Sequence, residues 1–169
     1  MLAEFLVLAV LPLLLIAAGV WDLASYTIPN TLSLALAGAF LLFAFAAGLP
    51  VAGLADHLGA GLIGLTLGFA LFAFGFIGGG DAKLFAAVLL WLGLRDSLPY
   101  ALAASVMGGA LTLLLVSLRR MPLPPQLAHR AWIARLHDPK GAVPYGVALA
   151  AGLFLILPQT EIFRLAAGL

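Results

Sequence analysis

Two aspartates and a run of glycines are the residues of this chain best suited to chemistry. Asp81 follows directly on the glycines at 78–80 and stands between two apolar runs. A carboxylate at membrane depth costs about 2.5 kcal/mol or more, and it usually faces a bundle interior or water and marks function. Glycines lower helix stability by roughly 1 kcal/mol each, and unwound backbone at this depth needs protein or water beside it. The stretch predicts a wet pocket in which another chain can approach Asp81; a short polar loop between helices is the alternative.

Asp22, at the end of the first apolar run, is the candidate partner of Asp81. Two carboxylates a few ångströms apart cannot both ionise easily, so one keeps a proton near neutral pH and the two titrate together. Such a pair suits peptide-bond hydrolysis, because the ionised member takes a proton from water while the protonated member donates to the carbonyl oxygen. No covalent intermediate is needed, which agrees with a chain that contains no cysteine.

The composition is that of an integral membrane protein. Of 169 residues, 64% are hydrophobic and 9% are charged, whereas globular domains are about 45–50% apolar and about 25% charged. Apolar runs of about 20 residues favour helices over a barrel, so we predict an all-α membrane protein. A net charge of +1 argues against nucleic acid as a partner, and we expect no metal or cofactor. The first apolar run lacks the basic start of a signal peptide, so we expect it to be retained.

The apolar runs divide into six predicted spans within a single membrane domain, 1–169. The spans are about 2–21, 31–47, 58–77, 82–94, 98–118 and 144–165, with a basic loop at 119–143. Five basic residues lie in that loop: Arg119, Arg120, Arg130, Arg135 and Lys140. Positively charged loops stay cytoplasmic, so this loop faces the cytoplasm and both termini face the outer side.

The parity of the spans brings Asp22 and Asp81 to one face of the membrane. Both come at the cytoplasmic ends of spans, whereas Asp56 and His57 fall in a linker on the outer side. Asp138 is also cytoplasmic but lies in the basic loop, where a solvated ion pair is worth little. If the bundle brings the first and fourth spans together, Asp22 and Asp81 form a pair.

The sequence resembles a known family over nearly its whole length. The glycine run and Asp81 match the Gly-x-Gly-Asp motif of intramembrane aspartyl proteases, and the following residues are similar to its form in type IV prepilin peptidases. Three stretches carry the resemblance: Gly78-Gly79-Gly80-Asp81-Ala82-Lys83, Asp22 with Ile28-Pro29-Asn30, and Val143-Pro144-Tyr145-Gly146.

The resemblance implies an endopeptidase of the bacterial inner membrane that removes the basic leader of a prepilin at the cytoplasmic face. It implies Asp22 and Asp81 as the catalytic pair. Bifunctional members carry a cysteine-bearing insert and also methylate the new N-terminus, but this chain has no such insert between its first two spans. It therefore looks like the short form associated with Flp-type pili, without methyltransferase activity.

Other residues are expected to support the site. Lys83 either acts on Asp81 or the substrate backbone, or reaches for anionic headgroups, and the segment 125–137 either forms an interfacial helix on membrane lipid or is a connecting loop. The supporting candidates are Gly78, Gly79, Gly80, Lys83, Pro29, Asn30, Pro144, Tyr145 and Gly146. The alternative functions are a proton-coupled carrier or channel that uses the same carboxylates, and a non-catalytic membrane subunit.

Overall fold

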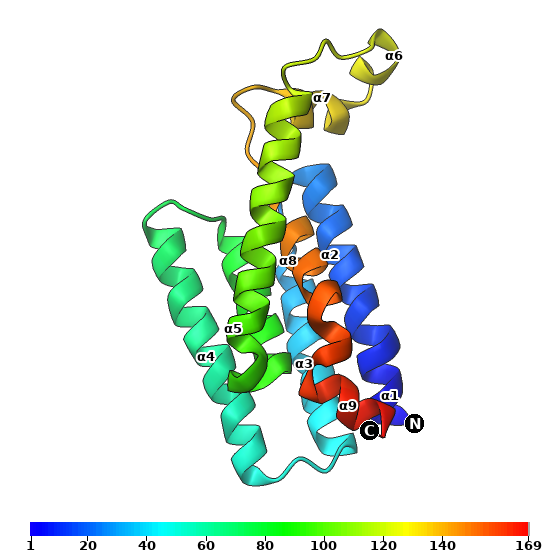
Figure 1. Cartoon of the computed structure of the whole chain (residues 1–169), viewed down its shortest axis with the longest axis vertical. Helices are drawn as coiled ribbons and strands as arrows, with labels where there is room; N and C mark the ends of the chain where they lie inside the picture. Colours follow the sequence, from blue (N-terminus) through cyan, green and yellow to red (C-terminus); the bar gives the residue numbers. More distant parts are fainter. Residues whose placement is uncertain (169) are drawn as a thin grey trace.

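The computed structural model describes residues 1–168, which form an elongated bundle of helices (Figure 1). No strand occurs among these residues, so the all-α prediction is confirmed. The helices in chain order are α1 (Leu2–Phe5), a π-helical turn (Leu6–Val10), α2 (Leu11–Ser25), α3 (Asn30–Ala46), α4 (Val51–Ala73), α5 (Gly79–Leu118), α6 (Pro125–Ala128), α7 (Ala131–His137), α8 (Tyr145–Ile156), a 3-10 turn (Leu157–Gln159) and α9 (Glu161–Ala167).

Three stretches of helix are long and apolar enough to cross a membrane, in agreement with a membrane protein. They are Leu2–Ser25, Val51–Ala73 and Gly79–Leu118, and a fourth results if α8 and α9, bent by 55°, count as one span. Helix α3 is apolar but has 17 residues. The count of six spans and the outer position of both termini stay predictions.

Helix α5 folds back on itself at Gly93. This residue has φ 70° and ψ 178°, a conformation essentially restricted to glycine. The rings of Phe85 and Tyr100 stack with centroids 5.8 Å apart, although a straight helix would separate them by about 22 Å. The first arm (79–92) and the second arm (94–118) of α5 are therefore two neighbouring helices, which agrees with the predicted division between spans four and five.

Two side chains of α4 hold this reversal in place. Asp56 Oδ2 accepts a hydrogen bond from the Leu94 N–H at 2.9 Å, and His57 Nδ1 lies 2.9 Å from the Leu90 carbonyl oxygen. The prediction that Asp56 and His57 lie in a linker before span three is wrong, because α4 already begins at Val51. These polar residues occupy helical positions because the broken end of the first arm gives them backbone partners.

Replacing Gly93 by alanine is expected to destabilise the fold. A Cβ atom at this position would lie 2.5 Å from Asp56 Oδ2, in a backbone conformation that L-residues avoid. Such strain costs about 1–3 kcal/mol, so the melting temperature of the purified protein in detergent should fall. Gly59, whose Cβ would meet open space, is the matched control. A Gly93→Ala protein as stable as Gly59→Ala would contradict this account of the turn.

Two other helix boundaries differ from the predicted ones. The first span was expected to end at about residue 21, but helix α2 continues to Ser25, so Asp22 lies in its last turn. The predicted span 144–165 is interrupted by the 3-10 turn that contains Pro158, because proline removes a backbone donor. Thr160 then caps α9, accepting a hydrogen bond from the Phe163 N–H at 3.4 Å.

Small residues let α4 approach the first arm of α5 closely. A Cβ on Gly64 would lie 2.9 Å from Leu89 Cδ2, and one on Gly68 would lie 3.0 Å from Ala82 Cα. This is the helix packing expected of small residues spaced four apart. It fixes the start of α5, and with it Asp81.

Candidate functional site

Asp22 is a buried carboxylate on the last turn of α2, where this helix packs against α8 (Figure 1). Its Oδ2 accepts a hydrogen bond from the Gly146 N–H at 2.7 Å. Gly146 lies in the first turn of α8, whose exposed N–H groups favour a negative charge. A Cβ at position 146 would lie 2.9 Å from this same oxygen, so the contact depends on glycine.

Asp81 is the third residue of α5 and is half-buried. Its Oδ2 accepts a hydrogen bond from the Gly78 N–H at 3.1 Å, as expected for an acidic residue that caps a helix start. The glycine run is therefore not unwound throughout, because α5 already begins at Gly79. The cap offsets part of the helix-forming cost of Gly79 and Gly80.

Asp22 lies in the last turn of α2 and Asp81 in the first turn of α5, and these two helix ends lie at the same end of the bundle (Figure 1). Ile28, in the connection between α2 and α3, contacts the backbone beside both. A Cβ on Gly80 would lie 3.1 Å from Ile28 Cβ, and one on Gly146 would lie 2.9 Å from Ile28 Cδ1. Ile28 was part of a matched stretch but was not predicted as a site residue, since an isolated isoleucine carries no chemical signal.

Each carboxylate keeps one oxygen free of protein hydrogen bonds within residues 1–168. The Oδ2 atoms of Asp22 and Asp81 accept the backbone N–H groups described above, whereas their Oδ1 atoms have no such partner. Backbone N–H groups thus fix the orientation of both carboxylates without using all of their acceptor capacity. At the free oxygens, an ionised carboxylate can accept a hydrogen bond from water, and a protonated carboxyl can donate one to a carbonyl oxygen.

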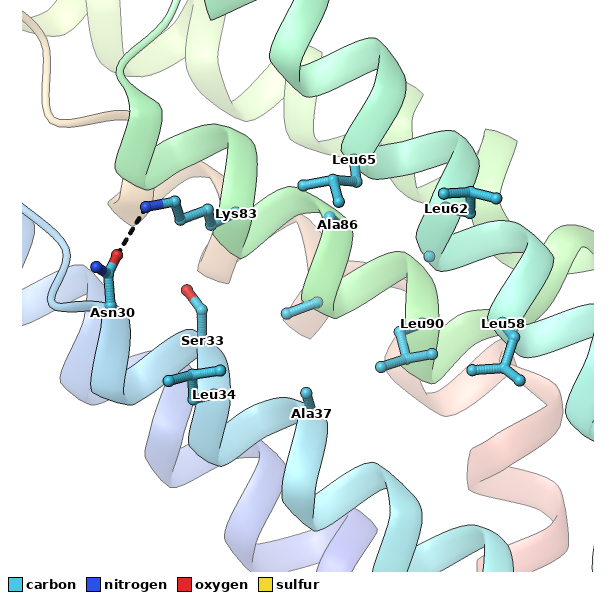
Figure 2. A pocket seen from close by; sticks show the side chains of 12 residues that line it. Asn30, Ser33, Leu34, Ala37, Leu58, Leu62, Leu65, Lys83, Ala86 and Leu90 are labelled. Atoms are coloured by element: carbon cyan, nitrogen blue, oxygen red, sulfur yellow. Dashed lines mark hydrogen bonds between the residues drawn. The ribbon is translucent and has the colours of Figure 1, made fainter.

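Lys83 points toward α3. Its Nζ donates a hydrogen bond to Asn30 Oδ1 at 2.8 Å (Figure 2). Asn30 is the first residue of α3, and Pro29 precedes it as the N-cap. This contact supports neither of the two roles considered for Lys83, which were action on Asp81 and anchoring in lipid headgroups. It ties the start of α5 to the start of α3.

Pro144 and Tyr145 place the third predicted stretch beside the aspartates. Pro144 is the buried N-cap residue of α8, so its rigid ring sets where the helix begins. Tyr145 is the next residue, and its ring lies 3.2 Å from the position of a Cβ on Gly108 in the second arm of α5. The three stretches singled out in the sequence thus gather at one end of the bundle.

Arg119 ties the basic loop to the start of α8 and was missed in the sequence. Its guanidinium donates hydrogen bonds to three carbonyl oxygens, with distances of 2.8, 2.9 and 2.7 Å to Leu136, Gly141 and Ala142. The loop contains the two short helices α6 and α7 where one segment had been expected. Only the abundance of basic residues was visible in the sequence, not which one folds the loop.

Tyr26 follows the last turn of α2, where its N–H donates a hydrogen bond to the Asp22 carbonyl oxygen at 2.7 Å. It ends α2 with φ 55°, and its hydroxyl is buried without a hydrogen-bond partner among the described residues. Burial raises the pKa of Tyr26, while the charges of Arg119 and Arg135 act in the opposite direction. The basic loop also packs against the helix that carries Asp22, because α7 contacts α2.

Removing the Arg119 side chain is expected to lower the peptidase activity by about tenfold. Hydrogen bonds from charged groups are worth about 1.5–3 kcal/mol each, and only part of the lost free energy is expected to disturb the position of Gly146. The Arg119→Ala protein should also be cut faster by an added protease within 119–143. The exposed neighbour Arg120 provides the control, and equal effects of Arg119→Ala and Arg120→Ala would refute this role.

The fold is that of a helical membrane protein with two aspartates, Asp22 and Asp81, at the same end of its bundle. A family model described as the type IV leader peptidase family matches residues 9–113, which include Asp22 and Asp81. The chain belongs to the type IV leader peptidase family, which makes it a peptidase. Pro144, Tyr145 and Gly146 lie outside the matched range. Searches of curated proteins and of solved structures gave no significant match.

Proposed function

We propose that the chain is an aspartyl endopeptidase that removes the basic leader peptide of Flp-like type IV prepilins at the cytoplasmic face. Membership of the type IV leader peptidase family supports a pilin precursor as substrate. The observation that carries the aspartyl mechanism is the position of Asp22 and Asp81. They come from helices far apart in sequence, stand at helix ends on the same end of the bundle, and are linked through Ile28, which lies beside both Gly80 and Gly146.

In the proposed reaction, one aspartate is ionised and the other protonated. The ionised carboxylate takes a proton from water, whose oxygen attacks the scissile carbonyl carbon, while the protonated carboxyl donates to the carbonyl oxygen. The tetrahedral intermediate then collapses, the C–N bond breaks and the leaving nitrogen receives a proton from the pair. Gly78 and Gly146 hold the carboxylates in orientation through their N–H groups.

The proposed setting is the bacterial cytoplasmic membrane, crossed six times with both termini outside. The fold-back of α5 at Gly93 supports counting its two arms separately. Lys83 and the five basic residues of 119–143 then lie inside, and only Arg95 and Arg164 lie outside. We propose no N-methyltransferase activity, because the chain has no cysteine.

Reconstitution with a candidate prepilin tests the proposal. The purified protein in proteoliposomes should convert a prepilin with a basic leader into a shorter product, and mass spectrometry of both fragments should locate the cut between the leader and the hydrophobic helix. Proton flux should be measured in the same vesicles. An acid-dependent proton flux without cleavage of any Flp-like prepilin would overturn the proposal in favour of a carrier.

A further inference from the structure

A cavity of about 510 Å³ opens from Asp81 along the membrane-embedded part of the bundle. We call it the Asp81 groove; its walls come from α4, both arms of α5 and α8, and include Leu67, Phe74, Phe85, Ser105, Gly109 and Leu149. Asp81 is the one charged residue that lines it, and Tyr145 lies there too. The groove is therefore continuous with the candidate catalytic centre.

The groove descends from Asp81 along the bundle. Phe85 is one helical turn after Asp81, and its ring stacks on Tyr100, whose neighbour Ala101 also lines the groove. A chain that occupies the groove and reaches Asp81 would thus have an apolar part beside the helices and a polar part at the end of the bundle.

Two walls of the groove differ in a way that suits a helix. The α4 wall presents large, exposed side chains such as Leu67 and Phe74, whereas the second arm of α5 presents small residues. A Cβ on Gly109 would meet no atom within 4 Å, and the Ser105 hydroxyl is already bonded to the Ala101 carbonyl oxygen at 2.7 Å. Small faces of this kind let a second helix approach closely in lipid.

A second groove, on the opposite side of the first arm of α5, has the wrong charge for a basic leader (Figure 2). We call it the Lys83 groove; it lies between α3 and α4, and Leu34, Leu58 and Leu62 line it. Lys83, its charged residue, is bonded to Asn30. The Asp81 groove is the one whose charge complements a basic leader.

We propose that the Asp81 groove binds the hydrophobic helix of the prepilin, with the peptide bond before that helix held at Asp81. This inference rests on the proposed function and adds the surface that receives the substrate. The apolar helix lies between the large side chains of α4 and the small face of the second arm of α5. The basic leader continues past Asp81 toward the cytoplasm.

Photocrosslinking tests the position of the helix. A photoreactive amino acid is placed at Gly109 or Ser105 in the Asp81 groove, or at Leu34 or Leu58 in the Lys83 groove, in the full-length Asp22→Asn protein co-expressed with a prepilin. The first two positions should crosslink to the hydrophobic helix of the prepilin, and the last two should not. Crosslinks from the Lys83 groove, or crosslinks of Gly109 to lipid alone, would overturn the proposal.

A steric variant gives a second readout. Gly109→Leu should lower cleavage of a full prepilin by at least about tenfold, and by more than it lowers cleavage of a short leader peptide without the hydrophobic helix. Gly38→Leu, at a glycine of α3 with open space around it, is the matched control. Unchanged cleavage of the full prepilin by Gly109→Leu would contradict the groove. If the wild type cleaves no prepilin, the proposed function itself fails.

Discussion

Asn in place of either Asp22 or Asp81 is expected to reduce leader cleavage by at least about 100-fold, because general acid–base catalysis contributes about 10²–10⁴-fold. An amide keeps the size of the side chain and can still accept the hydrogen bonds from Gly146 and Gly78. It cannot take up a proton from water at neutral pH. The rate of prepilin conversion on a gel measures the effect, and the level of inserted protein shows whether the fold survives.

Asp138→Asn is the matched control for this experiment. Asp138 belongs to the basic loop, where its Oδ1 accepts a hydrogen bond from the Lys140 N–H at 2.9 Å. Its replacement should leave cleavage near the wild-type rate. Substantial cleavage by both the Asp22→Asn and the Asp81→Asn protein would refute the aspartyl mechanism, whereas a loss in all three variants would point to a general effect of acidic residues on folding.

Gly146→Ala is expected to lower kcat by about 100-fold, the size of effect that a misplacement of about 1 Å produces in a catalytic group. A methyl group at position 146 would lie 2.9 Å from Asp22 Oδ2 and 2.9 Å from Ile28 Cδ1. Both neighbours are buried, so neither can give way without moving the end of α2 or the Ile28 connection. The aspartate should be displaced while the substrate groove remains intact.

The split between KM and kcat distinguishes this displacement from general unfolding. KM should change little in Gly146→Ala because the Asp81 groove does not include Gly146. Gly59→Ala, which would meet no atom within 4 Å, provides the control for alanine in a helical glycine position. A Gly146→Ala protein with wild-type kcat would show that the hydrogen bond from Gly146 to Asp22 does not govern the reaction.

Two helix starts could be predicted from local sequence: the spans expected at about 31 and 144 correspond to α3 and α8, whose N-cap residues are Pro29 and Pro144. The start of α4 was expected near 58, although it directly follows Pro50. The predicted spans 82–94 and 98–118 leave the turn between them at 95–97, a few residues after the observed fold-back of α5 at Gly93. Its position depends on a positive φ at Gly93 and on partners in α4, neither of which a local pattern reveals.

The position of Asp22 and Asp81 at one end of the bundle was predictable, whereas the contacts that orient their side chains were not. Counting the predicted spans puts Asp22 and Asp81 on one side of the membrane, and the structure places the end of α2 and the start of α5 at one end of the bundle. The Gly146 N–H that orients Asp22 lies 124 residues away in sequence, and Arg119 looks like any other basic residue of its loop. Such contacts depend on how α2, α5 and α8 meet, which a single sequence does not encode in any short motif.

Cysteine crosslinking in membranes tests most directly whether Asp22 and Asp81 share one site. The chain contains no cysteine, so a short bismaleimide can bridge a double variant with Asp22→Cys and Asp81→Cys. A protease site inserted at Gly48–Pro50, between the two positions, is then cut to divide the chain into two halves. The double variant with Asn30→Cys and Lys83→Cys is the positive control, because Lys83 Nζ lies 2.8 Å from Asn30 Oδ1. We predict that the two halves stay joined in both proteins. Halves that separate when the two aspartates are replaced, but stay joined in the control, would contradict the account.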